Sequence, residues 1–207
     1  MPRPRVARTS AVAAAVVLLA ALVACSDDRD RGRGAPPDAD PDLIGTASSA
    51  CDLPVLVRVP ERWAVEAMTP EMVARADDPR LTSPGGFALV CSLLGSPDGI
   101  LAPVFLFVAP PEVARGRTAE QLLQRFVRAA YGEGKIDMRE VTVGAGTGVE
   151  GTFTTSRATP SPVQRRAFVL PTPTGVVVVT NGGLDQESID EGLADYASVR
   201  DSMDLPD

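Results

Sequence analysis

Few side chains in this chain of 207 residues are suited to covalent or acid–base chemistry. It has no histidine, which removes the commonest general base and the commonest nitrogen ligand of metal ions. Cys25, Cys51 and Cys91 supply the only thiols, and Lys135 is the only lysine. The chemistry open to the chain therefore centres on these four residues and on its carboxylates.

The first 24 residues are typical of an export signal. Three arginines lie within the first eight residues, and the apolar stretch 11–23 follows. That stretch is shorter than the roughly 20 residues that a membrane-spanning helix needs. No twin-arginine pair precedes it, which favours export of the unfolded chain through the Sec route. We therefore expect residues 1–24 to be removed.

The residues around Cys25 resemble the lipobox of bacterial lipoproteins, Leu-(Ala/Ser/Val)-(Gly/Ala)-Cys. Leu22, Val23, Ala24 and Cys25 match all four positions. The resemblance implies a diacylglycerol on the Cys25 thiol, cleavage after Ala24, and a protein anchored at the outer face of the cell membrane. At about 0.8 kcal/mol per buried CH₂, two or more acyl chains hold a domain on a bilayer durably. An ordinary signal peptide with a chance cysteine is the alternative.

The composition restricts the partners. Loss of residues 1–24 removes three arginines and no acid, so the formal net charge changes from -7 to -10. An acidic surface repels phosphate backbones, and nucleic acid is therefore not expected as a partner. The preference for arginine over lysine, with abundant Ala, Val, Gly and Pro, is typical of high-GC coding and favours an actinobacterial source.

The mature chain divides into a tether and one folded domain. Residues 25–49 are polar, charged and interrupted by Pro and Gly, so we expect a flexible tether. Asp38, Asp40 and Asp42 imitate the start of a calcium loop, but the sixth position of that loop is not glycine. The folded domain is expected over residues 50–207.

Strand and helix patterns alternate within this domain. Thr118 and Gln121 form the pattern of a capping box, and Gly132 ends that helix. A second helix is expected to begin at Asp185 and to continue towards the C-terminus, and a short one to span 70–77. Hairpin turns are expected at 96–99 and 144–148. Strands are predicted at 55–59, 87–94, 101–108, 139–143, 149–155, 165–170 and 176–180.

Cys51 and Cys91 are the two thiols that remain after lipidation. One opens the folded region and the other lies in a predicted strand, in a compartment that permits disulfides. We predict that they pair. Two buried free cysteines or a redox pair are the alternatives, and the redox pair is disfavoured because no C-x-x-C spacing is present.

Three residues are candidates for binding. Trp63, the only tryptophan, follows the first predicted strand and either closes one end of the core or recognises a partner at the surface. Arg165 and Arg166 begin a late strand, so alternation directs one of them outward. A solvated face is the simpler interpretation of this pair, and an anion site is the alternative.

Catalysis has weak support in the sequence. A Ser–Lys dyad would require Lys135, which lies in an expected loop. The carboxylate pairs Asp77–Asp78 and Asp185–Glu187 are better explained by helix starts, where the helix dipole favours acids. We therefore expect no enzymatic activity, no metal site and no cofactor.

The order of these segments resembles the Mog1/PsbP-like domains, a group that includes LpqN-type lipoproteins. The resemblance rests on "LVRVPERWAVEAM", "VFLFVAPP", "TAEQLLQRFVRAAY", "VTVGAGTGVEGTFTTS" and "DQESIDEGLADYASVRDSM", and covers most of residues 51–207. It implies an α+β fold, an α/β/α sandwich with a largely antiparallel central sheet, and a role in binding or assembly.

Together, these observations favour a membrane-anchored lipoprotein that acts as a non-catalytic binding or accessory module in the cell envelope. Its expected partners are the membrane, through the lipid anchor, and an unidentified envelope protein or small-molecule ligand. The alternatives are an envelope hydrolase that uses carboxylate or Ser–Lys chemistry and a structural spacer.

Overall fold

The computed structural model describes residues 42–206, except 62, 77, 96–101 and 156–160. These residues form one antiparallel sheet of seven strands, in the order β3-β4-β5-β9-β8-β7-β6. Its strands are β3 (Ala64–Ala67), β4 (Ala88–Leu94), β5 (Val104–Ala109), β6 (Ile136–Val143), β7 (Gly146–Thr155), β8 (Val163–Thr172) and β9 (Gly175–Asn181). The helices are α1 (Pro70–Arg75), α2 (Pro79–Thr82), α3 (Pro111–Ala114), α4 (Ala119–Tyr131), α5 (Gln186–Glu191) and α6 (Leu193–Asp201), with a short 3-10 turn, η1 (Pro84–Gly86).

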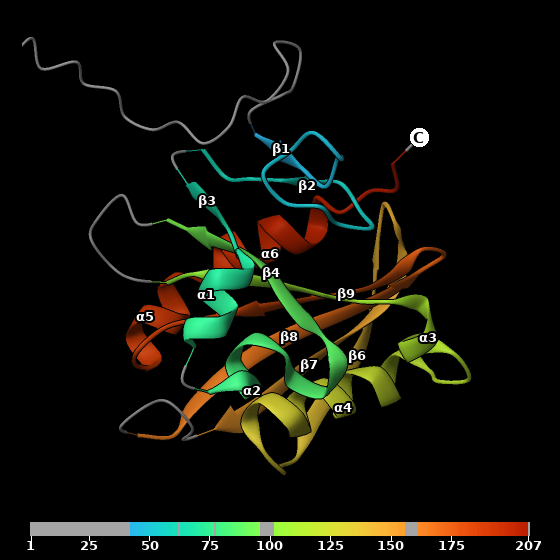
Figure 1. Cartoon of the computed structure of the whole chain (residues 1–207). Helices are drawn as coiled ribbons and strands as arrows, with labels where there is room; N and C mark the ends of the chain where they lie inside the picture. The colour runs from blue at the N-terminus through green and yellow to red at the C-terminus, as the bar shows by residue number, and fades with distance from the viewer. Residues whose placement is uncertain (1–41, 62, 77, 96–101, 156–160, 207) are drawn as a thin grey trace, which may run out of the picture. The chain divides into compact units, whose positions relative to one another are not determined.

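Both faces of the sheet are covered, which confirms the expected α+β sandwich (Figure 1). On one face, α4 packs its apolar side on β7 and β8. Figure 1 shows α6, in red, on the other face, where Tyr196 and Val199 join the core. Successive side chains of a strand point to opposite faces. Strands β7, β8 and β9 therefore contribute side chains to two hydrophobic cores, one on each face of the sheet. Val149, Val169 and Val178 face α4, while Phe168 and Val179 face α6.

The folded unit begins earlier than the expected boundary at residue 50. Strand β1 (Leu43–Ile44) pairs antiparallel with β2 (Val57–Arg58), and the Ile44 side chain is buried in the core on the α6 face. The expected tether over 25–49 is therefore wrong at its C-terminal end, because the apolar pair Leu43–Ile44 within this polar stretch forms a strand paired with β2. Leu56 and Asp204 bond to each other through both backbone amides, which attaches this segment to the end of the chain.

Two other expectations need correction. The helix expected from Asp185 onward is two helices, α5 and α6, which meet at Gly192. A Cβ at Gly192 would lie 2.7 Å from that of Ala102, so the chain approaches the β5 side closely at this break. The strand expected at 55–59 contributes only β2, which lies outside the seven-stranded sheet. The two edge strands of that sheet are β3 and β6. The turn expected at 96–99 lies outside the described residues.

The predicted capping box of α4 is confirmed. The Thr118 hydroxyl accepts from the Gln121 amide at 3.3 Å, and the Gln121 side chain accepts from the Thr118 amide at 3.0 Å. Gly132 ends the helix with φ 94°, a conformation that glycine tolerates. Asp185 likewise caps α5, where the sequence predicts a helix start, and Thr69 caps α1.

We expect Thr118→Ala to lower the free energy of unfolding by about 1 kcal/mol, because the Gln121 backbone amide in the first turn of α4 loses the hydroxyl that accepts from it. Urea unfolding followed by circular dichroism measures the change. The matched control is Thr174→Ala, at an exposed threonine in the turn between β8 and β9. Equal stability of the two variants would contradict a stabilising role for the cap.

Candidate functional site

The side chain of Glu150 is a buried carboxylate bonded to several polar side chains. Alternation along β7 places Glu150 on the α6 face, directly opposite Arg139 of the edge strand β6. Only 2% of the Glu150 side chain is exposed, whereas 63% of Arg139 is. An ionised carboxylate at such a position requires close donors to replace water.

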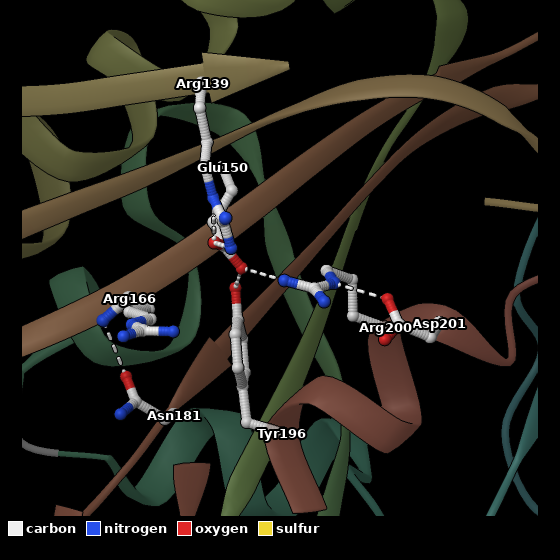
Figure 2. A network of polar contacts seen from close by, with 7 residues as sticks. All are labelled: Arg139, Glu150, Arg166, Asn181, Tyr196, Arg200 and Asp201. Atoms are coloured by element: carbon white, nitrogen blue, oxygen red, sulfur yellow. Dashed lines mark hydrogen bonds and ion pairs between the residues drawn. The ribbon is translucent and has the colours of Figure 1, made fainter. Parts of the chain in front are cut away.

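Three side chains donate hydrogen bonds to Glu150, and Figure 2 shows Arg139, Tyr196 and Arg200 converging on its carboxylate. Arg139 donates from Nε and Nη2 to Glu150 Oε2 at 2.9 and 2.5 Å. The Arg200 guanidinium and the Tyr196 hydroxyl, both from α6, donate to Oε1. Arg200 Nε also donates to Asp201 at 2.7 Å. The carboxylate thus connects α6 to the outer half of the sheet.

The protonation states of this cluster follow from its contacts. Burial alone would raise the pKa of Glu150, but the hydrogen bonds and charges of Arg139 and Arg200 outweigh it and hold the pKa below its ordinary value. Burial, together with the negative charge of Glu150, raises the pKa of the Tyr196 hydroxyl well above its usual range. At neutral pH Glu150 is therefore an ionised acceptor and Tyr196 a protonated donor.

The alternation expected for the arginine pair is present, and Arg165 is its inward-pointing member. Its guanidinium is buried on the α4 face and donates to the backbone carbonyls of Asn181 and Gly183, each at 3.0 Å. It also lies over the Tyr131 ring, 5.7 Å from the centroid. Arg165 therefore connects the start of β8 to the end of β9, and its buried Nε has no hydrogen-bond partner within the described part of the chain.

Arg166 points to the opposite, α6 face and is half-exposed. Its backbone amide donates to Asn181 Oδ1 at 2.8 Å, a contact visible in Figure 2. Its neighbour in the register of β7 is Thr152, whose own neighbour on β6 is Asp137. A polar row thus crosses the outer strands beside the Glu150 cluster.

Trp63 lies far from the arginine pair in the sheet. It precedes the edge strand β3, and three strands separate β3 from β8. The indole is half-buried against the core on the α6 face. A Cβ at Gly95 would lie 2.0 Å from this ring, so the indole rests directly on the backbone there. The structure supports the core-closing role and does not bring Trp63 together with Arg165 or Arg166.

The predicted pairing of Cys51 and Cys91 is confirmed. Their disulfide joins the segment before β2 to the middle of β4, with Cα atoms 5.9 Å apart. Both cysteines are buried within the core on the α6 face. The bond therefore attaches the N-terminal part of the domain to the sheet.

Of the residues considered for catalysis, Lys135, Asp78 and Asp185 have structural contacts, and Asp77 lies outside the described residues. Lys135 Nζ is exposed and lies 2.7 Å from Asp137 Oδ1, which raises the pKa of the lysine. Asp78 caps α2 and bonds to Arg80, and Asp185 caps α5. Among the residues that the structure describes, no group of three or more His, Cys, Asp or Glu side chains could hold a metal ion.

A hollow of about 430 Å³ opens near the N-terminal segment, at the end of β4, β5 and β9 that is far from Trp63. Its wall is mainly apolar, and Asp52 is the only charged residue among the described residues that line it. The other lining residues are Leu53, Pro54, Gly86, Ala88, Val108, Ala109, Pro110, Thr174 and Gly175. This hollow holds no convergent set of carboxylates or hydroxyls.

Sequence reasoning missed the Glu150 cluster. Arg139 and Glu150 lie within predicted strands, and Tyr196 and Arg200 lie within the predicted helix, but they are far apart in the chain. One signal was available: Glu150 is an acid at an inward position of an apolar strand. Such an acid needs a buried cationic partner.

The fold resembles that of solved PsbP-type proteins. The solution structure of cyanobacterial PsbP (CyanoP) from Synechocystis sp. PCC 6803 superposes with a TM-score of 0.52 at 9% identity, over 84% of this chain and 98% of that chain. The crystal structure of LpqN, involved in cell envelope biogenesis of Mycobacterium tuberculosis, gives a TM-score of 0.44 at 15% identity, over 73% of this chain and 83% of that chain. The likeness to CyanoP agrees with the α+β fold expected from the sequence.

The family follows from the sequence match. Residues 24–203 match the family model described as "Uncharacterised lipoprotein", and the chain belongs to this lipoprotein family. No curated protein matches the chain. Within the described ranges, the helices are too short or too polar to cross a membrane.

Proposed function

We propose that this lipoprotein is held at the outer face of the cell membrane by a diacylglyceryl group on Cys25, and that its domain acts there as a non-catalytic binding or accessory module. The observation that carries the proposal is the extent of the family match, which begins at Ala24, next to Cys25. Membership in a lipoprotein family supports a lipid-bearing role for this cysteine, which stands within Leu22-Val23-Ala24-Cys25. The buried disulfide agrees with an oxidising compartment outside the cytoplasm.

The binding role, in preference to catalysis, is supported by the state of the reactive groups. A general-base lysine needs a lowered pKa, whereas Asp137 raises that of Lys135. Glu150 is buried and already accepts from three side chains, so no substrate atom reaches it. The apolar hollow beside Pro54 is typical of a binding surface and lacks the polar groups of a hydrolase site.

We expect Cys25→Ala to release the protein from the membrane, because no acyl chain can then be attached. Membrane fractionation of cells that express the full chain, followed by immunoblotting, measures the distribution. The wild type should remain in the membrane fraction after a high-salt wash, and the variant should lose most of its membrane-bound fraction. Ser26→Ala, at the next residue, is the control and should behave like the wild type. Equal retention of the Cys25→Ala variant would contradict the proposal.

A further inference from the structure

The Arg166 guanidinium differs from the arginines around it. Arg139 and Arg200 are bonded to Glu150, and Arg165 is bonded to two carbonyls. Among the described residues, the Arg166 side chain has no hydrogen bond or ion pair, and only its backbone amide bonds to Asn181. The guanidinium of this partly exposed residue thus has five N–H donors without an acceptor among the described residues.

A second unpaired donor lies beside it. Asn181 is 1% exposed, and its Nδ2 has no hydrogen-bond partner within the described part of the chain. The orientation of this amide is fixed, because Oδ1 accepts from the Arg166 backbone amide at 2.8 Å. A buried donor without an acceptor is unfavourable, so an acceptor from outside the chain would be stabilised here.

The residues around Arg166 include several positive charges, although the protein as a whole is acidic. Arg139, Arg166 and Arg200 lie on the α6 face of the outer strands or on α6 itself. Two carboxylates are bonded within this group, those of Glu150 and Asp201. The positive charge of Arg166 reaches the Tyr196 hydroxyl within this cluster. Asp137, the acid nearest in register, is paired with Lys135. The charge of Arg166 is therefore not neutralised by the contacts that the structure describes.

We propose that Arg166, with Asn181 and the neighbouring Thr152, forms a binding site for an oxyanion, the carboxylate or phosphate group of a ligand. The planar fork of arginine matches both groups through paired N–H···O bonds. Asn181 Nδ2, buried next to the Arg166 backbone, adds a second donor, directly or through one water. The inference rests on the binding part of the proposed function and names the chemistry of the ligand.

The test is a thermal unfolding series on the full lipidated chain in non-ionic detergent. The probes are sodium acetate and sodium phosphate, each compared with sodium chloride at the same ionic strength and pH. A ligand that binds only the folded state raises Tm, by roughly 3–5 °C when the probe exceeds its Kd tenfold. We expect a saturable rise with at least one oxyanion. A rise with acetate alone identifies a carboxylate site, and a rise with phosphate alone identifies a phosphate site.

Three variants show whether the rise in Tm depends on Arg166. Arg166→Gln should abolish the oxyanion-dependent rise, and Arg166→Lys should retain part of it, since the charge remains but the fork is lost. Arg115→Gln, at an exposed arginine after α3, should respond like the wild type. No rise above chloride, or an equal rise in Arg166→Gln, would overturn the site. Membrane release of Cys25→Ala is measured separately, so the oxyanion site can fail while the anchoring proposal stands.

Discussion

Reduction of the Cys51–Cys91 disulfide is expected to lower the free energy of unfolding by roughly 4 kcal/mol. The bond closes a loop with a sequence separation of 40. On the chain-entropy model, a loop of this length restricts the unfolded chain by about that amount. The bond also attaches the segment that carries β1 and β2 to β4, so its loss should loosen that segment first.

Urea unfolding of the oxidised and reduced wild type measures this difference with no change of side chain. A Cys51→Ala/Cys91→Ala double variant provides an independent comparison, and it should resemble the reduced protein apart from the smaller side chains at two buried positions. Identical midpoints for the oxidised and reduced protein would show that the bond contributes no stability. Free thiols at both positions in the native protein would contradict the pairing itself.

Glu150→Gln is expected to lower the free energy of unfolding by about 3 kcal/mol at neutral pH. The substitution leaves the buried Arg200 with only the exposed Asp201 as a charged partner. Removal of one member of a buried ion pair leaves an uncompensated charge, which is strongly destabilising. Arg139→Gln should cost less than about 1 kcal/mol, because 63% of that side chain is exposed to water.

The control for this substitution is Glu140→Gln, at an exposed acid on the same edge strand β6, which should change stability by less than about 0.5 kcal/mol. Chemical denaturation of the three variants gives the ranking. A Glu150→Gln variant as stable as Glu140→Gln would contradict a stabilising role for the cluster.

The effect of Glu150 should depend on pH in a defined direction. Its folded-state pKa lies below the ordinary value of 4.5, in spite of burial, because of Arg139 and Arg200. A group with a lowered folded-state pKa stabilises the fold above its unfolded-state pKa, and this contribution is lost as the pH falls through the folded-state value. The stability difference between wild type and Glu150→Gln should therefore be full at pH 7 and should shrink below about pH 4.5. A difference that stays constant down to pH 3 would contradict this assignment.

The sequence predicted the parts of the fold that depend on local chemistry. The apolar runs around Val178 and Phe168 identify strands because every second residue enters a core on one side of the sheet. The cap at Thr118 and the end at Gly132 involve only residues within one helix. The disulfide was predictable because two cysteines remained in an exported domain.

Features that depend on residues far apart in the sequence were not predictable from local patterns. The short strand β1 exists because Leu43–Ile44 finds β2, and nothing in its polar surroundings indicates that partner. The break at Gly192 depends on the close approach of Ala102. The Glu150 cluster joins residues that are 50 positions apart in the chain, and the unpaired Asn181 amide is visible only when the strands are placed beside each other.

The anchoring proposal can be tested most directly on the N-terminal peptide of the protein isolated from membranes. Protease digestion and mass spectrometry should give a first peptide that begins at Cys25 and carries the mass of a diacylglyceryl group. A first peptide that still contains Ala24, or one that begins elsewhere with an unmodified Cys25, would contradict the account.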